Sequence, residues 1–408
     1  MRIALLNTGT ELLLGDVRDA HLSFIAQEIL PLGLRIEEQR TVPDGTAITG
    51  ALTALFSSTD ILFVTGGLGP TTDDITREVT AELLKLPLVH DEMVMELIRD
   101  RLRKRGIKLV ETISRQALVP AGGKVLPNEN GTAPGLYLRQ NINPQVPSPH
   151  LFLLPGPPRE LQPMFRQSVL PLLRVLAPKS SIVRRLYKIA NKGESIVEKA
   201  IGKKVLAIPG VELGYCARPG EVDVRVMGAA AVVEQAGEII ARELGLSVFS
   251  SEDETLEEVI VKLLAARKET LSLAESCTGG LLANRVTNVP GASEVFVAGY
   301  VSYANATKTD LYQIEPKLID EYGAVSEPVA RAMAEGARRR SETTYAIATT
   351  GIAGPTGGSA EKPVGTVFVG LATPSETITR KFFFPNDRET FKQMTAQAAF
   401  EMLRQQVI

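Results

Sequence analysis

The feature that most constrains the fold of this chain is the alternation of two hydrophobic periods over residues 1–170. Short apolar runs at Ile3–Leu6 and Ile61–Val64 have the length of buried strands. His21–Leu30 and Thr72–Leu84 instead repeat apolar residues at helical spacing. Strands that alternate with helices favour a mostly parallel sheet covered on both faces. The sequence therefore predicts a doubly wound α/β domain, which would bind ligands in the loops at the carboxyl ends of its strands.

Two further segments follow with different patterns. Residues 171–252 predict a small α+β unit, in which the strand pair around Pro219-Gly220 turns on a dipeptide typical of tight turns. This unit resembles a KH-type module but lacks the Gly-x-x-Gly loop that clamps RNA, so a spacer or dimerisation role is expected. Thr255 then opens a helical pattern, and strands and helices alternate again. We predict three domains, at 1–170, 171–252 and 253–408.

Composition excludes several classes of function. The chain has 45 basic and 47 acidic side chains and a net charge of −2, which gives no electrostatic reason to expect a nucleic-acid or membrane partner. Its two cysteines, Cys216 and Cys277, cannot form a disulfide framework. The amino terminus lacks a signal-peptide layout, and no apolar stretch approaches the ~18 residues of a membrane span. A soluble, cytoplasmic protein is expected.

A candidate nucleophile stands at a strand-to-helix turn in the third domain. The strand-like run Thr270–Ala274 is followed by Ser276, two glycines and a helix that starts near Leu281. The first N–H groups of a helix have no partner within it and can hold an oxyanion or a phosphate. Since serine also caps helices routinely, capping by Ser276 is the alternative interpretation.

A serine nucleophile needs a base, and the chain restricts the choice. All three histidines lie in the first domain, so a Ser-His-Asp triad within the third domain is impossible. Lys308 can serve if burial lowers its pKa, with Tyr303 as a proton relay or orienting group. The alternative is a lysine in a solvated loop. A glycine-rich segment, Thr349–Gly358, follows another strand and is either a substrate cradle or a long turn.

Five ordered motifs in this domain together resemble the carboxyl-terminal domain of the CinA family. They are AESCTGG at 274–280, YVSYANATK at 300–308, YGAVSEP at 322–328, TTGIAGPTGG at 349–358 and KPVGTV at 362–367. The resemblance implies hydrolysis of the carboxamide of nicotinamide mononucleotide to nicotinate mononucleotide and ammonia, without a cofactor. It implies that Ser276 attacks the amide carbon, that Lys308 takes its proton and that Tyr303 supports the pair.

The same resemblance implies which groups bind the substrate. The N–H groups of Thr278, Gly279 and Gly280 would stabilise the oxyanion. The loop residues expected to contact the nucleotide are Thr350, Gly351 and Gly354. Cys277 is an alternative nucleophile on chemical grounds, because thiolates are strong nucleophiles. A small buried side chain is the other interpretation of Cys277.

The first domain carries its own glycine-rich loop after the predicted strand Ile61–Val64. Gly66, Gly67 and Gly69 permit close approach of a ligand to the backbone, and a helix start beyond them suits a diphosphate. Asp73 and Asp74 would face such a phosphate through a bridging divalent cation. Capping of the helix by either aspartate is the alternative.

This half of the chain resembles the amino-terminal, molybdopterin-binding-like domain of the CinA family. The matching runs are GTELLLG at 9–15, GGLGPTTDDITRE at 66–78, NENGTAPG at 128–135 and LPGPPRE at 154–160. The resemblance implies a metal-dependent ADP-ribose pyrophosphatase, with Glu11, Asp73 and Asp74 at a divalent metal cation and Arg159 at a phosphate. It also implies a homodimer. After Gly15 the chain departs from the family's asparagine-rich run, with Asp19-Ala20-His21 in its place.

An alternative function from another class stays open. The protein would then be a nucleotide- or pterin-binding regulator linked to competence or the DNA-damage response, without turnover in its amino-terminal domain.

Overall fold

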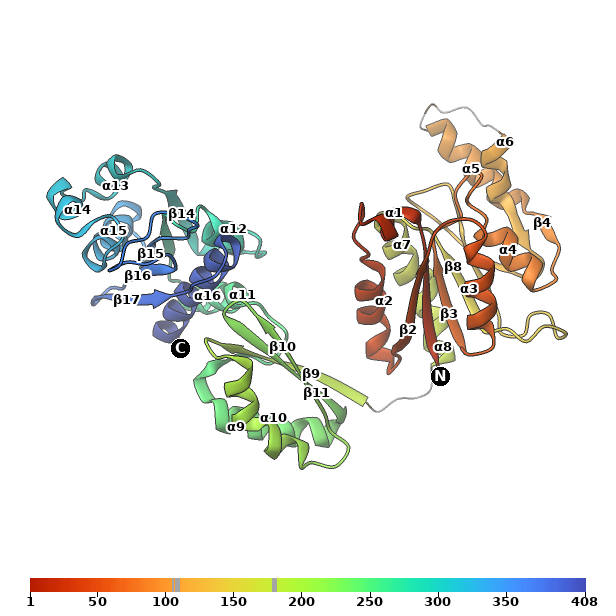
Figure 1. The fold of residues 1–408 in the computed structure, drawn as a ribbon, viewed down its shortest axis with the longest axis horizontal. Helices are drawn as coiled ribbons and strands as arrows, with labels where there is room; N and C mark the ends of the chain where they lie inside the picture. The colour runs from red at the N-terminus through yellow and green to blue at the C-terminus, as the bar shows by residue number, and fades with distance from the viewer. Residues whose placement is uncertain (105, 107–110, 178–181) are drawn as a thin grey trace. The chain divides into compact units, whose positions relative to one another are not determined.

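A computed structural model describes residues 1–104, 106, 111–177 and 182–408 (Figure 1). Its internal contacts divide the chain into two compact units, Met1–Ser181 and Ile182–Ile408. Among the described residues, no helix is both long and apolar enough to cross a membrane.

The first unit is built on a six-stranded sheet with the order β2-β1-β3-β8-β7-β6. The four strands from β2 to β8 are parallel, whereas β7 and β6 run antiparallel. The strands are β1 (Ile3–Thr8), β2 (Ile36–Val42), β3 (Ile61–Thr65), β6 (Lys124–Leu126), β7 (Gly135–Leu138) and β8 (His150–Leu154).

Helices cover both faces of this sheet because alternate residues of each strand point to opposite faces. In β3, Ile61 and Phe63 pack in one core with α2 and α8, while Leu62 and Val64 pack in the other with α3 and α4. The predicted doubly wound α/β domain is confirmed. The principal helices of the unit are α1 (Thr10–Leu14), α2 (His21–Ile29), α3 (Ala47–Phe56), α4 (Thr76–Leu83), α5 (Glu92–Lys104), α6 (Glu111–Ser114), α7 (Pro158–Met164) and α8 (Leu170–Leu176).

Two boundaries in this unit differ from the sequence-based expectation. The predicted helix Thr72–Leu84 begins only at Thr76, because Asp74 accepts hydrogen bonds from the backbone and side chain of Thr71 and holds the preceding residues in a turn. The domain boundary predicted at 170 falls at the first residue of α8, whose Leu170 and Leu173 are buried in the core of this unit. A small sheet of β4 (Leu88–His90) and β5 (Leu118–Pro120) lies beside α5.

The second unit begins with a β-α-β-β-α-β segment. Its four-stranded antiparallel sheet has the order β10-β11-β9-β12, which is the ferredoxin-like arrangement. The KH-type interpretation of this segment is therefore not confirmed. Its elements are β9 (Ile182–Ala190), α9 (Glu194–Leu206), β10 (Glu212–Arg218), β11 (Glu221–Ala229), α10 (Ala230–Leu244) and β12 (Val248–Ser250).

The remainder of the second unit is the predicted carboxyl-terminal α/β fold, built on a five-stranded sheet with the order β14-β13-β15-β16-β17. The first three strands in that order are parallel, so their carboxyl ends meet at one edge of the sheet. The strands are β13 (Leu271–Glu275), β14 (Phe296–Val301), β15 (Tyr345–Gly351), β16 (Thr366–Ala372) and β17 (Thr377–Phe383).

Two groups of helices cover this sheet. Residues of α11, α12 and α16 share one core with the strands, and residues of α14 and α15 share a second core with them. The predicted start of α11 at Thr255 is confirmed by a capping box, in which Thr255 and Glu258 exchange side-chain and backbone hydrogen bonds. The helices are α11 (Leu256–Arg267), α12 (Leu281–Thr287), α13 (Asn305–Tyr312), α14 (Pro316–Tyr322), α15 (Glu327–Ser341) and α16 (Arg388–Val407).

Candidate active site and the amino-terminal cavity

A cavity of about 210 Å³ opens where the parallel strands β13, β14 and β15 end. It brings together six residues that the sequence singled out, namely Ser276, Cys277, Tyr303, Lys308, Thr350 and Gly351. The other lining residues are Asn305, Ala324, Val325, Ala353 and Arg388. Segments that lie far apart in the sequence meet here because adjacent parallel strands deliver their loops to the same edge.

Ser276 occupies the turn that follows β13. Its backbone N–H donates to the carbonyl of Thr349 at 3.0 Å, and its side chain borders the cavity with 9% of the residue exposed. Helix α12 starts at Leu281 with Gly280 as N-cap, and its first N–H groups donate to the Glu275 carboxylate, so Ser276 does not cap it. The capping alternative is wrong, and the Ser276 hydroxyl faces the cavity residues instead.

Lys308 is buried, with 2% of the residue exposed, and therefore is not a solvated-loop lysine. Its Nζ donates to the carbonyl oxygens of Ser302 at 2.9 Å and Tyr303 at 3.3 Å. No carboxylate of the described chain lies within 4.0 Å of Nζ to stabilise its charge. Burial consequently lowers the pKa of Lys308, which favours the neutral amine that a general base requires. Ser276 and Lys308 line one cavity, and no direct hydrogen bond joins Nζ to the Ser276 hydroxyl.

Cys277 is buried beside Ser276, and burial raises the pKa of its thiol to about 12. At neutral pH the thiol stays protonated, which disfavours it as the nucleophile.

The three N–H groups that were predicted to hold the oxyanion are not equivalent. The N–H of Gly280 donates to the Glu275 carboxylate at 2.9 Å, and that of Gly279 donates to the carbonyl of Ser276 at 3.2 Å. Only the N–H of Thr278 has no acceptor within the described part of the chain. Because the turn itself uses the N–H groups of Gly279 and Gly280, the structure does not support them as oxyanion donors, and that role stays a prediction. The Thr278 side chain is fully buried against Thr349 and does not reach the cavity.

Arg388 is a cavity residue that sequence analysis missed. Its guanidinium donates to the Tyr303 hydroxyl at 2.7 Å and to the carbonyl of Gly354 at 3.0 Å. Gly354 thus supports Arg388 and does not itself line the cavity. Asp387 caps α16 by accepting from the N–H groups of Glu389 and Thr390, which sets Arg388 in the first turn. In the sequence, an aspartate able to cap a helix shortly after a strand was the signal that could have identified Arg388.

Tyr303 is placed differently from the role expected of it. Its hydroxyl accepts from Arg388, while only its backbone carbonyl contacts Lys308. Tyr303 therefore connects the arginine to the lysine-bearing loop, and its role as a proton relay stays a prediction.

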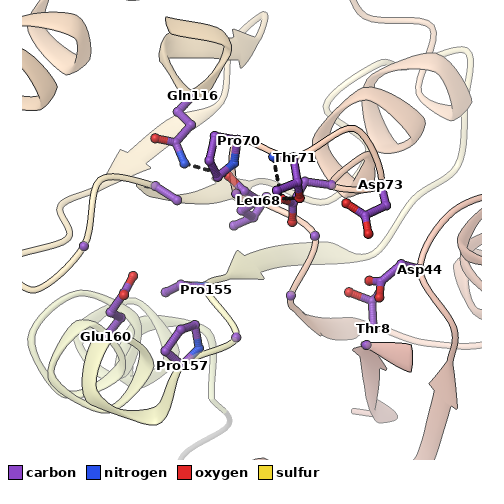
Figure 2. Close-up of a pocket in the computed structure, with 18 of the residues that line it drawn as sticks. Thr8, Asp44, Leu68, Pro70, Thr71, Asp73, Gln116, Pro155, Pro157 and Glu160 are labelled. Atoms are coloured by element: carbon purple, nitrogen blue, oxygen red, sulfur yellow. Dashed lines mark hydrogen bonds between the residues drawn. The ribbon is translucent and has the colours of Figure 1, made fainter. Parts of the chain in front are cut away.

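A second cavity, of about 420 Å³, lies at the carboxyl ends of the parallel strands in the first unit (Figure 2). All but one of the candidate residues from this half of the chain line the cavity. The lining candidates are Glu11, Gly66, Gly67, Gly69, Asp73 and Asp74. The exception is Arg159, whose side chain is 79% exposed and lies 4.0 Å from Glu160. The prediction of Arg159 as a phosphate contact is not supported, because the side chain points to solvent.

Gly66 shows why this loop needs glycine. Its φ of 94° lies in the left-handed region, and a Cβ there would collide with the backbone of Thr8. The loop can therefore pack directly against the end of β1.

The charged side chains that line this cavity all carry negative charge. Its lining contains five carboxylates, and none of the described lining residues is Lys, Arg or His. Sequence analysis missed two of the carboxylates, Asp44 and Glu160. Figure 2 shows Asp73 and Asp44 on the same side of the cavity, whereas Glu160 lies on another wall.

The predicted metal site of Glu11, Asp73 and Asp74 is not preformed. Among the described residues, no group of three or more His, Cys, Asp or Glu side chains is arranged to hold a metal ion. The reason is local: Asp74 accepts from both the N–H and the hydroxyl of Thr71. Neither aspartate caps α4, whose N-cap is Ile75 without a side-chain bond, so the capping alternative is also wrong. The nearby Thr71 side chain lowers the pKa of Asp73.

The unusual segment Asp19-Ala20-His21 lies outside the lining of this cavity. His21 is buried, and its ring nitrogens contact Gly156 O at 2.7 Å and the Thr65 hydroxyl at 3.0 Å. Asp19 accepts from Asn7 at 2.7 Å. These residues hold the ends of β1, β3 and β8 together behind the cavity.

Comparisons with known proteins found matches to both halves of the chain. A model described as "CinA C-terminal domain" matches residues 253–407, and one described as "Probable molybdopterin binding domain" matches residues 4–175. A "CinA-like protein" of Akkermansia muciniphila is 43% identical and covers 98% of this chain and 96% of its own length. A "Putative competence-damage inducible protein" of Caldicellulosiruptor bescii is 40% identical, with 98% of both chains covered.

Solved structures match part of the chain. A competence/damage-inducible protein from Agrobacterium tumefaciens is 38% identical, covers 37% of this chain and 92% of its own, and has a TM-score of 0.36. A CinA superfamily protein from Escherichia coli is 32% identical, covers 37% of this chain and 88% of its own, and also has a TM-score of 0.36.

Proposed function

Because this chain belongs to the CinA family, we propose a function for its carboxyl-terminal domain. This domain hydrolyses the carboxamide of nicotinamide mononucleotide to nicotinate mononucleotide and ammonia. The observation that carries the proposal is the cavity in which Ser276 meets Lys308, a buried lysine with a lowered pKa and no carboxylate partner among the described residues. A serine hydroxyl and a lysine of lowered pKa that line one cavity are the groups that a Ser-Lys mechanism of acyl transfer needs.

The chemistry follows from these two side chains. Neutral Lys308 takes the proton of the Ser276 hydroxyl as its Oγ bonds to the amide carbon, and then gives that proton to the departing ammonia. The C–N bond breaks and leaves an ester on Ser276. Water, deprotonated by the same lysine, then cleaves the ester and releases the carboxylate product and the free serine.

Ammonia release from nicotinamide mononucleotide, with and without a chelator, tests this proposal. We expect release that survives the chelator, because no step needs a metal. Absence of ammonia in both conditions would contradict the deamidase proposal and favour a binding or regulatory role.

Arg388 would recognise the phosphate of the substrate. Its guanidinium lines the cavity, and the Tyr303 hydroxyl and the Gly354 carbonyl hold it in place. Guanidinium groups bind phosphate through paired hydrogen bonds.

We expect Arg388→Gln to raise KM for nicotinamide mononucleotide roughly 10–100-fold, because it removes a charged hydrogen bond to the phosphate. The value of kcat should change little. Steady-state kinetics with this substrate and with nicotinamide riboside, which lacks the phosphate, measure the effect. The riboside should react equally with both proteins. Arg380→Gln, on the exposed part of β17, is the control. Equal losses on both substrates would refute phosphate recognition.

A second activity is favoured by the acidic cavity of the first unit. A free diphosphate would be repelled by five carboxylates without a basic side chain among the described lining residues. Mg²⁺ is commonly held by one or two carboxylates together with phosphate oxygens. Asp73 and Asp44 fit such a shared cation, which would neutralise charge on the diphosphate. The cavity thus supports a cation-dependent ADP-ribose pyrophosphatase.

Calorimetric binding of ADP-ribose should therefore require Mg²⁺ or Mn²⁺ and vanish in EDTA. We expect Asp73→Asn to weaken cation-dependent binding at least about 10-fold, since it removes a charged ligand. Asp100→Asn, on α5 and outside this cavity, should leave binding unchanged. Binding of ADP-ribose that is equally tight in EDTA would exclude the shared-cation arrangement.

A further inference from the structure

The carboxylate of Glu275 has a role that neither the motifs nor the catalytic pair explain. Glu275 is the last residue of β13, directly before Ser276, and only 1% of it is exposed. Such a buried charge needs compensation. No Lys, Arg or His of the described chain lies within 4.0 Å of it.

Compensation comes from the first turn of α12. The carboxylate accepts from the N–H of Gly280 at 2.9 Å, of Leu282 at 3.1 Å and of Ala283 at 2.8 Å. These are groups that a helix leaves without internal partners, at the end where its dipole is positive. Glu275 therefore joins the end of β13 to the start of α12, and the turn that carries Ser276 spans this connection.

The backbone of Glu275 extends the connection toward the base. Its carbonyl accepts from the N–H of Ser302 at 2.8 Å, and the carbonyl of Ser302 in turn accepts from Lys308 Nζ at 2.9 Å. One residue is thus bonded to the helix behind the nucleophile and to the loop that holds the base.

We propose that Glu275 is a positioning residue for the hydrolysis: its carboxylate sets the 276–279 turn so that Ser276, which lines the cavity, is held in position relative to the substrate. The inference rests on the proposed deamidase function. It also explains why the Gly280 N–H is withdrawn from oxyanion binding, since Glu275 already occupies it. In addition, the charge of Glu275 contributes to the raised pKa of Cys277, although burial is the larger cause.

The chain offers a matched control for a purely structural role. Glu258 is also a carboxylate that accepts at a helix start, in the capping box of α11, but it does not line the cavity. Losing either carboxylate removes a cap from a helix of the same unit. Only Glu275 adjoins the nucleophile.

The experiment compares Glu275→Gln, Glu275→Asp and Glu258→Gln with the wild type in ammonia release, each normalised to the folded fraction from near-ultraviolet circular dichroism. Glutamine keeps the shape but turns an amide N–H₂ toward backbone N–H donors. We expect kcat of Glu275→Gln to fall roughly 10–100-fold, with KM within about threefold of wild type. Glu275→Asp keeps the charge with a shorter reach, so its kcat should be intermediate. Glu258→Gln should lower the melting temperature without changing kcat.

Two outcomes would overturn the inference: an unchanged kcat per folded Glu275→Gln molecule, or an equal loss of kcat in Glu258→Gln. If Glu275→Gln does not fold, the kcat of Glu275→Asp decides in the same way. A wild-type protein that releases no ammonia would instead remove the proposed function, which separates the two failures.

Discussion

Ser276→Ala is expected to lower ammonia release from nicotinamide mononucleotide by at least about 10⁴-fold, as removal of a serine nucleophile does in other acyl-transfer enzymes. The reason is that the adjacent thiol, the stronger nucleophile in principle, is in no state to replace the hydroxyl. The neighbouring Cys277 is buried, and the pKa of its thiol is raised to about 12, so little thiolate exists at neutral pH. Coupled detection of ammonia at saturating substrate measures the loss.

The matched control for this variant is Cys277→Ala, one residue further along the same turn. It should keep kcat within a few-fold of wild type, because the thiol takes no part in the chemistry. Ser276→Ala should also leave cation-dependent binding of ADP-ribose unchanged, since that cavity belongs to the other compact unit. Ammonia release by Ser276→Ala at a near-normal rate, or its loss in Cys277→Ala, would refute the assignment of the nucleophile.

Lys308→Met is expected to lower kcat roughly 10²–10⁴-fold, which is the usual contribution of a general base. Methionine keeps a similar length and apolar stem but cannot accept a proton. KM should change little, because Lys308 Nζ is bonded to the carbonyls of Ser302 and Tyr303 in the ligand-free protein. Steady-state kinetics separate the two parameters. A large rise in KM with an unchanged kcat would make Lys308 a binding residue instead.

The dependence on pH gives an independent test of the same lysine. Since burial lowers the pKa of Lys308, kcat/KM of the wild type should rise with pH and level off below the ordinary lysine value of about 10.4. That rising limb should be absent in Lys308→Met.

Protein stability should respond in a defined direction. Below the folded pKa of Lys308 the lysine is charged in both states, and burial of that charge destabilises the fold; the cost is relieved as pH rises from the folded pKa to the higher pKa of the unfolded chain. Lys308→Met should therefore melt no lower than the wild type at neutral pH. A clear drop in the melting temperature of Lys308→Met would contradict this expectation. It would indicate that the hydrogen bonds of Lys308 to the loop stabilise the fold by more than burial of its charge destabilises it.

Local patterns in the sequence were sufficient for most of the elements. The strand predicted at Ile61–Val64 and the helix predicted at His21–Leu30 each end within one residue of the predicted bound, because a buried face imposes its spacing on the residues. The pattern was less informative where side chains compete for the backbone. The helix expected from Thr72 starts four residues later because Thr71 and Asp74 form a turn of their own. The ferredoxin-like order of the middle strands depends on pairings between distant segments, which periodicity does not report.

The sequence by itself determined which residue types stand at the strand ends, and hence Ser276, Lys308 and the glycine-rich loops as candidates. Only the tertiary structure decided that Ser276 and Lys308 share a cavity with Arg388, that Glu275 takes the helix N–H groups, and that Arg159 lies outside the acidic cavity. The physical reason is that burial and hydrogen bonding depend on neighbours brought in by other strands. A lysine becomes a base, and a carboxylate a helix cap, through the groups that surround it and not through its place in the chain.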